Sequence, residues 1–176
     1  TGGSNSAVGY QALDGCTDGG GNAALGYRAG YSITSGSRNV GLGEQALRGV
    51  TTGNDNIGLG HQSFFATCTG SGNIGMGYRS LFSLTSGSSN VALGYQAGND
   101  ITTQSASTYV GYRAGLNHTQ GDNVAIGYQV DTNNCGNIIT IGYECATVGN
   151  LHITMGNGSG ANRIYNSFTA NANWTR

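Results

Sequence analysis

The sequence contains no proline and no lysine, and only 9% of its 176 residues are charged. Disordered chains usually combine charge with proline, and collagen needs proline beside a glycine at every third position, so neither class fits. The seven cations are all arginine, the eight acids are scattered and the net charge is −1. Such a chain offers no basic face to nucleic acid and no polybasic segment to an anionic membrane.

Long apolar runs are absent as well. The apolar stretches span only a few residues, whereas a helix that crosses a bilayer needs about 18 or more, so we expect no membrane insertion. Thr1 is followed by neither a charged region nor an apolar leader, and the sequence starts within a repeat and without methionine. We therefore expect that upstream residues exist and that any export signal lies among them.

The sequence is rich instead in glycine and asparagine, with 33 and 19 residues respectively. One set of glycines recurs every 17 residues and then, toward the end, at spacings of 16, 15 and 14. These key glycines are Gly9, Gly26, Gly43, Gly60, Gly77, Gly94, Gly111, Gly127, Gly142 and Gly156. A fixed period is the signature of a repeat array, so we predict about ten units over residues 1–160, followed by a connector over residues 161–176.

A strand pattern leads into each key glycine. Aliphatic or methionine side chains stand one position and, in most units, three positions before it, with a small residue between them, as in Val91-Ala92-Leu93. Apolar residues at alternate positions indicate a β-strand, here with one bulky face and one thin face. Asparagine opens most strands: Asn5, Asn22, Asn39, Asn56, Asn73, Asn90 and Asn123. We predict that these amides stack and hydrogen-bond along the axis of the array.

Tyrosine follows the key glycine in most units, and glutamine or arginine comes next. The tyrosines are Tyr10, Tyr27, Tyr78, Tyr95, Tyr112, Tyr128 and Tyr143. A second, shorter strand is predicted at Tyr31–Thr34, Leu84–Thr85 and Ile101–Thr102. A turn with positive φ is predicted ten residues after the key glycine, at Gly19, Gly36, Gly53, Gly70, Gly87 and Gly121.

A unit of 17 residues is too short to be a stable domain, so successive units must stack and pair strand on strand. The predicted fold is therefore an all-β parallel β-solenoid, whose ten or so coils at about 4.8 Å each make a rod of about 50 Å. One slender coil buries little apolar surface, and the thin Gly/Ala face would let another backbone come close. We predict that several chains associate side by side with closed symmetry.

The unit Asn-aliphatic-small-aliphatic-Gly-Tyr-Gln/Arg-Ala, as in Asn22–Ala29 and Asn90–Ala97, resembles the head repeats of trimeric autotransporter adhesins and of phage tail fibres. The resemblance covers residues 1 to about 156 and implies a left-handed β-roll assembled as an elongated, intertwined homotrimer. Adhesin heads typically use a shorter repeat, so the period of 17 favours the phage fibres.

The segment Asn162–Arg176 resembles the stretch that precedes an endosialidase-type intramolecular chaperone in phage fibres, which trimerises the fibre and then cuts itself off. The resemblance implies a non-enzymatic structural fibre segment of a phage tail or virion appendage. It would be located on the virion, outside the cell, and its partners would be other fibre or virion proteins and a host surface glycan or protein. The alternative is the head of a bacterial trimeric adhesin at the cell surface. A remote alternative is an ice-binding solenoid, suggested by recurring threonines such as Thr34 and Thr85.

No motif for catalysis, cofactor or metal binding is recognisable. Glycine pairs such as Gly41 and Gly43 recur in phase inside strands, without the helix that a dinucleotide loop needs. The acids keep no common phase, and the three histidines occupy different repeat positions, although a trimer axis could still gather three copies of one histidine. No Ser/His/Asp set has a supporting spacing. We predict that the protein is not an enzyme and carries no cofactor.

The four cysteines are expected to be free thiols. Cys16 and Cys68 lie three coils apart, about 14 Å along the axis and beyond the limit of about 7 Å between the Cα atoms of a disulfide. Cys135 and Cys145 lie in adjacent units at different phases, so a bridge between them stays open. Free thiols suit assembly in a reducing cytoplasm.

Departures from the repeat are the candidate receptor contacts: Glu44, His61, Phe64, Phe65 and Phe82. Glu44 and His61 replace the tyrosine, and the phenylalanines gather at one corner of successive coils. Exposed aromatic side chains are typical of recognition sites, but these side chains could instead pack into the corners of the rod. The tyrosine row likewise could stack against sugars or against itself from coil to coil.

Overall fold

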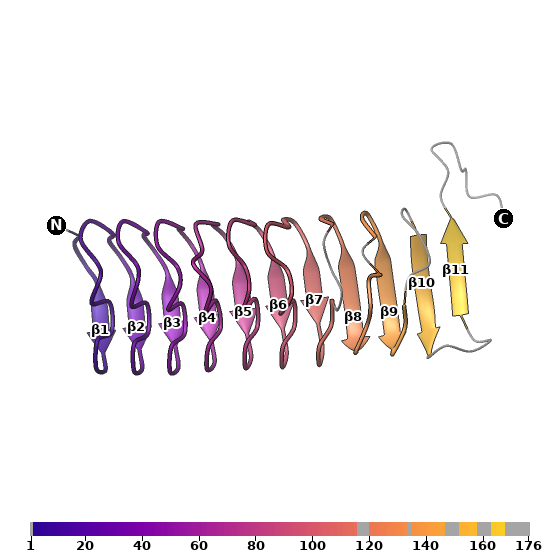
Figure 1. Ribbon diagram of the computed structural model, residues 1–176, viewed down its shortest axis with the longest axis horizontal. Helices are drawn as coiled ribbons and strands as arrows, with labels where there is room; N and C mark the ends of the chain where they lie inside the picture. Colours follow the sequence, from indigo (N-terminus) through magenta and orange to yellow (C-terminus); the bar gives the residue numbers. More distant parts are fainter. Residues whose placement is uncertain (1, 116–119, 134, 147–151, 158–162, 168–176) are drawn as a thin grey trace.

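The computed structural model describes residues 2–115, 120–133, 135–146, 152–157 and 163–167. Its strands form one sheet in sequence order, and Figure 1 shows them side by side along a rod. They are β1 (Ser6–Val8), β2 (Ala23–Leu25), β3 (Val40–Leu42), β4 (Ile57–Leu59), β5 (Ile74–Met76), β6 (Val91–Leu93), β7 (Thr108–Val110), β8 (Val124–Tyr128), β9 (Ile139–Tyr143), β10 (His152–Asn157) and β11 (Arg163–Ser167). The described residues form no helix, and the chain is an all-β parallel β-solenoid of about eight turns.

The pairing register follows the spacing of the key glycines. β1 to β10 pair in parallel, with each residue of β1 to β6 opposite the residue 17 positions later, as in Leu25 opposite Leu42. The offset then falls to 16, 15 and 14, as in Val110 opposite Ile126. The predicted repeat and its shortening are thus confirmed. β11 runs antiparallel to β10 and lies within the predicted connector.

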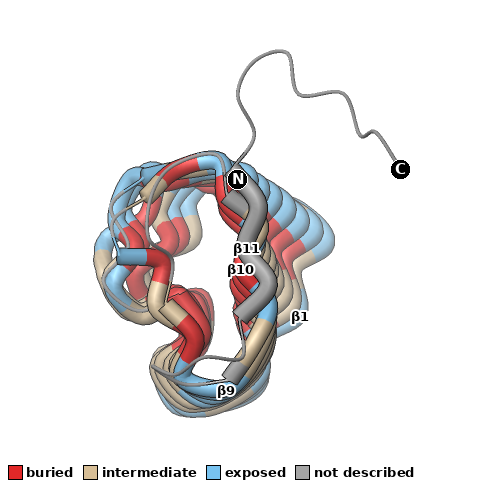
Figure 2. Tube along the Cα trace, turned by 90° about the vertical axis from the view of Figure 1, so that its right-hand side faces the viewer, coloured by how far each residue is buried: buried red, intermediate tan, exposed pale blue. Residues whose placement is uncertain are grey.

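The two faces of the strands are reversed relative to the prediction. The small residues point into the coil: Ala24 and Ala92 are buried, whereas Leu25 and Leu42 on the other face are 51% and 40% exposed. Figure 2, a view along the rod, shows the buried residues lining the inside of the coil. The thin face therefore packs against the return segment of its own chain. The prediction that it receives another chain is wrong, because alternation reveals two faces without showing which one is enclosed.

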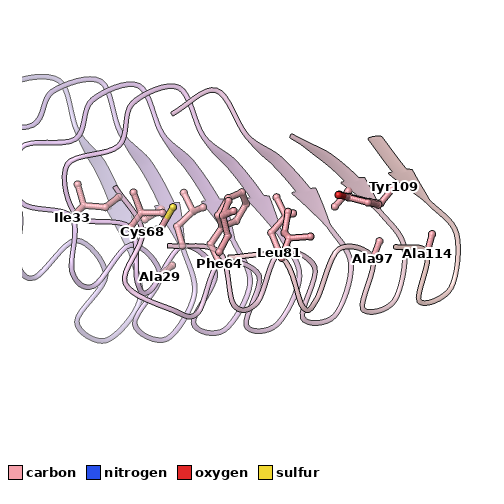
Figure 3. Close-up of a cluster of buried hydrophobic side chains, with 14 of the residues drawn as sticks. Ala29, Ile33, Phe64, Cys68, Leu81, Ala97, Tyr109 and Ala114 are labelled. Atoms are coloured by element: carbon pink, nitrogen blue, oxygen red, sulfur yellow. The ribbon is translucent and has the colours of Figure 1, made fainter. Parts of the chain in front are cut away.

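The core is built by complementary volumes on the strands and on the return segments that face them. Gly58 lies beside Leu47, and Gly75 lies beside Phe64. A Cβ atom on Gly58 would lie 2.6 Å from Cδ2 of Leu47, and one on Gly75 would lie 2.7 Å from Cε2 of Phe64. Figure 3 shows the core side chains in a row along the axis. Large side chains on one wall thus require glycine on the other, because interiors pack without voids.

Tyr109 reverses this arrangement in the seventh coil. It takes the small-residue position of β7 and is buried, and the facing positions are Gly98 and Gly115. A Cβ atom on Gly98 would lie 3.0 Å from Cδ2 of Tyr109, and one on Gly115 would overlap Cδ1 of the same ring. Burial raises the pKa of the Tyr109 hydroxyl, so this group stays protonated.

In their described residues, the return segments contain no second strand. The predicted strands at Tyr31–Thr34, Leu84–Thr85 and Ile101–Thr102 lie in turns and bends. Left-handed residues recur in every coil, for example Gln45 with a φ of 56° and Leu47 with 53°, and such residues cannot continue a strand. Backbone hydrogen bonds nevertheless join the return segments of successive coils, for example from Ser32 N to Arg48 O at 3.1 Å and from Thr34 N to Thr51 O at 2.9 Å.

Glycine is needed ten positions after the key glycine because a side chain would not fit there, not because of the backbone conformation. Gly19, Gly36, Gly53, Gly70, Gly87 and Gly121 do not have positive φ, so that prediction is wrong. A Cβ atom at Gly53 or Gly70 would instead overlap the carbonyl oxygen of the equivalent glycine in the next coil. The left-handed residue is the one just before the asparagine, such as Asp55 with a φ of 58°.

The predicted asparagine row is confirmed. Asn73 is buried, and its Nδ2 donates to Oδ1 of Asn56 at 3.1 Å and to the carbonyl oxygen of Gly87 at 3.0 Å. Its own Oδ1 accepts from the backbone N–H of Asn90 at 2.9 Å. The Asn73 amide thus joins three coils. In the seventh coil Ser107 replaces asparagine, and its Oγ accepts from the backbone N–H of Asn123 at 3.2 Å.

All four cysteines are free thiols, and the bridge left open between Cys135 and Cys145 is not formed. Cys68 is buried in the core cluster that also holds Val50 and Leu84. It pairs with Val50 through an isolated parallel bridge at an offset of 18, one residue more than the repeat. Burial raises the pKa of the Cys68 thiol, which makes it a poor nucleophile at neutral pH.

A first prediction concerns the asparagine row. Replacing Asn73 by Ala removes the partners of two buried backbone groups, Asn90 N–H and Gly87 C=O, so we expect the free energy of unfolding to fall by about 3 kcal/mol. Denaturant titration followed by circular dichroism measures this change. The matched control is Asn54→Ser, because Asn54 also accepts from a backbone N–H in a row otherwise formed by serines. If both variants lost the same free energy of unfolding, the larger contribution that we assign to the buried amide would be wrong.

A second prediction tests volume complementarity. Gly75→Ala should destabilise the fold by about 1–3 kcal/mol through overlap with Phe64. Combining it with Phe64→Leu copies the Leu81/Ala92 pair found one coil later. We therefore expect the double variant to be more stable than the sum of the two single effects by about 1 kcal/mol, measured as a double-mutant cycle. Strict additivity would show that the two walls do not constrain each other.

Candidate interaction surfaces

The outward side of β1 to β10 carries a stripe of aliphatic side chains, which we call the outer strand face. Its most exposed members range from 36% to 63% in exposed fraction: Val8, Leu25, Leu42, Met76, Ile139 and Met155. None of the strands β1 to β10 contains Asp, Glu, Lys or Arg. A continuous exposed apolar surface of this kind is typical of a protein–protein contact.

The tyrosine row runs beside the outer strand face. From Tyr78 to Tyr143 the rings stack from coil to coil with centroids 4.9–5.1 Å apart and interplanar angles of 8–17°. Tyr10 and Tyr27 form a shorter stack with centroids 5.6 Å apart. The predicted alternative of coil-to-coil stacking is thus present. Because neighbouring rings cover both faces of the inner members, sugars cannot stack there and only ring edges and hydroxyl groups face outward.

Glu44 and His61 interrupt the tyrosine row. His61 Nε2 lies 3.8 Å from Glu44 Oε1, and the side chains are 39% and 57% exposed respectively. The ring of His61 lies against Tyr78 with centroids 5.5 Å apart. Both residues are therefore accessible, as their role as candidate receptor contacts requires.

The three phenylalanines among the candidate receptor contacts separate into two groups. Phe65 and Phe82 are partly exposed and stack with centroids 5.0 Å apart and an interplanar angle of 3°. Phe64 is fully buried in the core beside Gly75. The prediction of Phe64 as a receptor contact is therefore wrong, and the alternative of packing is right for this residue. Its left-handed φ of 52° turns the side chain inward.

Two adjacent rows that follow the tyrosines form what we call the arginine corner. One row consists of Gln11, Arg28, Gln45, Gln62, Arg79, Gln96, Arg113 and Gln129, and the other of Tyr31, Arg48, Phe65 and Phe82. Arg79 joins the rows, since its guanidinium carbon lies 5.2 Å from the ring centroid of Tyr78 and 4.9 Å from that of Phe82. Arg28 lies similarly over Tyr27 and Tyr31. The sequence had indicated the glutamine and arginine row beside the tyrosines, and Phe65 and Phe82 as candidate contacts, but not that the arginines lie over the aromatic rings.

The recurring threonines, which include Thr17, Thr34 and Thr85, form what we call the threonine row. They lie on turns and bends, not on a strand. The hydroxyl groups of Thr17, Thr34 and Thr85 donate to carbonyl oxygens one coil later at 3.0–3.3 Å. Buried Cys68 interrupts the row. The hydroxyl donors are thus used within the rod, which disfavours an ice-binding face.

The described part of the chain shows neither a metal-binding cluster nor a membrane-spanning helix. The residues described there gather no group of three or more His, Cys, Asp or Glu side chains that could hold a metal ion. In the same residues no helix is long and apolar enough to cross a membrane. His118 lies outside the described residues.

No protein-family model, no curated protein and no solved structure matches this chain. Its function is therefore argued from the repeat, the outer strand face and the arginine corner.

Proposed function

We propose that the chain is a non-enzymatic structural segment of a phage tail fibre or similar virion appendage. In this proposal three copies form a left-handed β-roll trimer, which projects from the virion and presents surfaces for attachment to the host. The repeat pattern of residues 1 to about 156 supports this assignment by its resemblance to fibre head repeats. The rod shape supports it as well, since stacked coils extend a chain in one direction (Figure 1).

The observation that carries the proposal is the outer strand face. Half-exposed aliphatic side chains repeat there in coil after coil, without a charged residue from β1 to β10. Interface centres are depleted of charge in the same way. Because every coil presents the same surface, a second copy aligned with the rod would bury apolar area along its whole length.

The proposal includes closed symmetry of the assembly, and the outer strand face supports it. When one surface of a chain binds a different surface of the next chain, the chains form a closed ring if the rotation between them closes. If it does not close, they form a fibre without a defined end. Three chains that turn their outer strand faces toward a common axis bury all three stripes. The bulky face, not the thin face, is thus the contact surface in this proposal.

The second candidate is the head of a bacterial trimeric adhesin, which would use the same faces in the same way. The two differ in what accompanies the rod: coiled coil and an outer-membrane anchor for an adhesin, a self-cleaving chaperone for a fibre. Reading the codons beyond Arg176 in the gene distinguishes them.

A third prediction tests the assembly. Light scattering on the purified chain should give three times 17.9 kDa. Replacing Leu42 and Met76 by Glu places charges on the outer strand face outside the coil interior, so we expect the mass to fall to that of one chain while circular dichroism retains the β-sheet signal. The matched control is Thr34→Glu with Thr85→Glu, two exposed positions on the threonine row.

Two outcomes contradict the proposed assembly. One is a well-folded monomer of the unmodified chain at micromolar concentration. The other is an unchanged mass after Leu42→Glu and Met76→Glu, which would place the subunit contact on another surface.

A further inference from the structure

The arginines of the described residues are distributed unevenly around the rod. Arg28, Arg48, Arg79 and Arg113 belong to the arginine corner, whereas Arg38 lies just before Asn39 of the asparagine row and Arg163 belongs to β11. From Arg28 to Gln129 the two rows of this corner contain no acid, and the nearest carboxylates in line with them are Asp14 before and Glu144 after. The exposed pair of Glu44 and His61 lies beside the corner, in the tyrosine row. The corner is therefore a positive stripe on a nearly neutral protein.

These four arginines differ from Arg38 in their partners. Arg38 is paired with Asp55 through two hydrogen bonds of 2.6 and 2.8 Å, which lower the pKa of the Asp55 carboxyl. Within the described residues no ion pair involves a member of the arginine corner. Nε of Arg48 is buried and has no hydrogen-bond partner among the described residues. Nε of Arg79 donates to a neutral acceptor, Oε1 of Gln62, at 2.8 Å.

Aromatic rings hold the guanidinium groups of Arg28, Arg48 and Arg79 in place. The guanidinium carbon of Arg48 lies 4.7 Å from the ring centroid of Phe65, and the Phe65 ring is itself stacked on Phe82. Arg79 is held between Tyr78 and Phe82, and its Nε is fixed by Gln62. Stacking on a ring restricts a guanidinium plane and leaves its outer N–H groups directed to solvent. Such a preorganised fork binds a carboxylate with two parallel hydrogen bonds.

The spacing along the rod indicates how anions would be arranged on a ligand. Arg48, Arg79 and Arg113 lie on the third, fifth and seventh coils, so successive members are about 10 Å apart along the axis. One coil rise is comparable to the length of one pyranose unit. A linear saccharide with an acidic sugar at every second position would therefore meet an arginine at each carboxylate. A nucleic acid carries phosphates at much closer spacing, which so sparse a row would leave largely unpaired.

We propose that the arginine corner binds an acidic polysaccharide that lies along the rod, with its carboxylates on Arg48, Arg79 and Arg113. This site makes the proposed function more specific, since it names the class of host surface molecule that the fibre binds. It rests on the proposed function only for its biological setting. Phe65 and Phe82 act by positioning the guanidinium groups of Arg48 and Arg79. Phe64 has no part in it, because its side chain is enclosed in the core.

The experiment is calorimetric titration at low ionic strength with two probes: a hexasaccharide of alternating glucuronate and N-acetylglucosamine, and hexagalacturonate. Each is compared with its carboxyl-reduced form. We expect binding of at least the alternating hexasaccharide, weakened at least tenfold by carboxyl reduction. We expect the variant Arg48→Gln, Arg79→Gln, Arg113→Gln to lose at least tenfold in affinity, because each change keeps a planar amide but removes the charge. The matched control Arg38→Gln should change the affinity less than twofold.

Several results would overturn the proposal: no binding of either acidic probe, equal binding of the reduced forms, equal loss in the Arg38→Gln control, or equally tight binding of an oligodeoxythymidylate. A fall in particle mass of the triple variant would assign the corner to a contact between chains and would also overturn it. Light scattering on the same samples separates this proposal from the assembly. A monomer that binds the hexasaccharide contradicts the trimer alone, whereas a trimer that binds neither probe contradicts the polysaccharide site alone.

Discussion

The buried asparagine amide is the interaction on which the rest of the structure depends. A strand of three residues has too few hydrogen bonds of its own to hold a register, yet seven successive strands pair with little variation. The amide of Asn73 links three coils at once and leaves neither of its own polar atoms unpaired. A shift by one residue would bury an amide without partners, and this penalty fixes the alignment of all the rows on the surface.

Because the register is fixed, the side chains on one wall of the coil can change in size from coil to coil, provided that those on the opposite wall change in the opposite sense. Leu47 and Phe64 face glycines, whereas Tyr109 faces Gly98 and Gly115, so the enclosed volume is filled by different residues in different coils. The aliphatic side chains of the strands are then free to point outward, where they form the outer strand face. The same constraint explains why adjacent phenylalanines separate, with Phe64 inside and Phe65 on the arginine corner.

Spacing in the sequence was sufficient to predict the parallel solenoid, the shortening repeat and the asparagine row, because each depends on identical residues at fixed intervals. It was insufficient for the direction of the strand faces, since Val91-Ala92-Leu93 reads the same whichever side is enclosed. The inverse sizes of Phe64 and Gly75, and of Tyr109 and Gly98, were the signal that could have decided it. The missing second strand has another cause: left-handed φ at Gln45 or Leu47 is imposed by the coil and is not indicated by residue type. The arginine corner was only partly predicted, because the pairing of Arg38 with Asp55 and the absence of such a partner at Arg48 are properties of the folded chain.

The stacking of the coils also has a mechanical consequence. Hydrogen bonds between parallel strands run along the rod, so a pull on its two ends loads them lengthwise, and every junction between coils carries the whole force in series. The rupture force is then that of the weakest junction rather than the sum over all of them. Where Ser107 takes the place of asparagine, the hydroxyl accepts from Asn123 but spans fewer neighbours than an amide does. Under tension along the rod, the seventh and eighth coils would therefore separate before the coils that are joined by an asparagine amide.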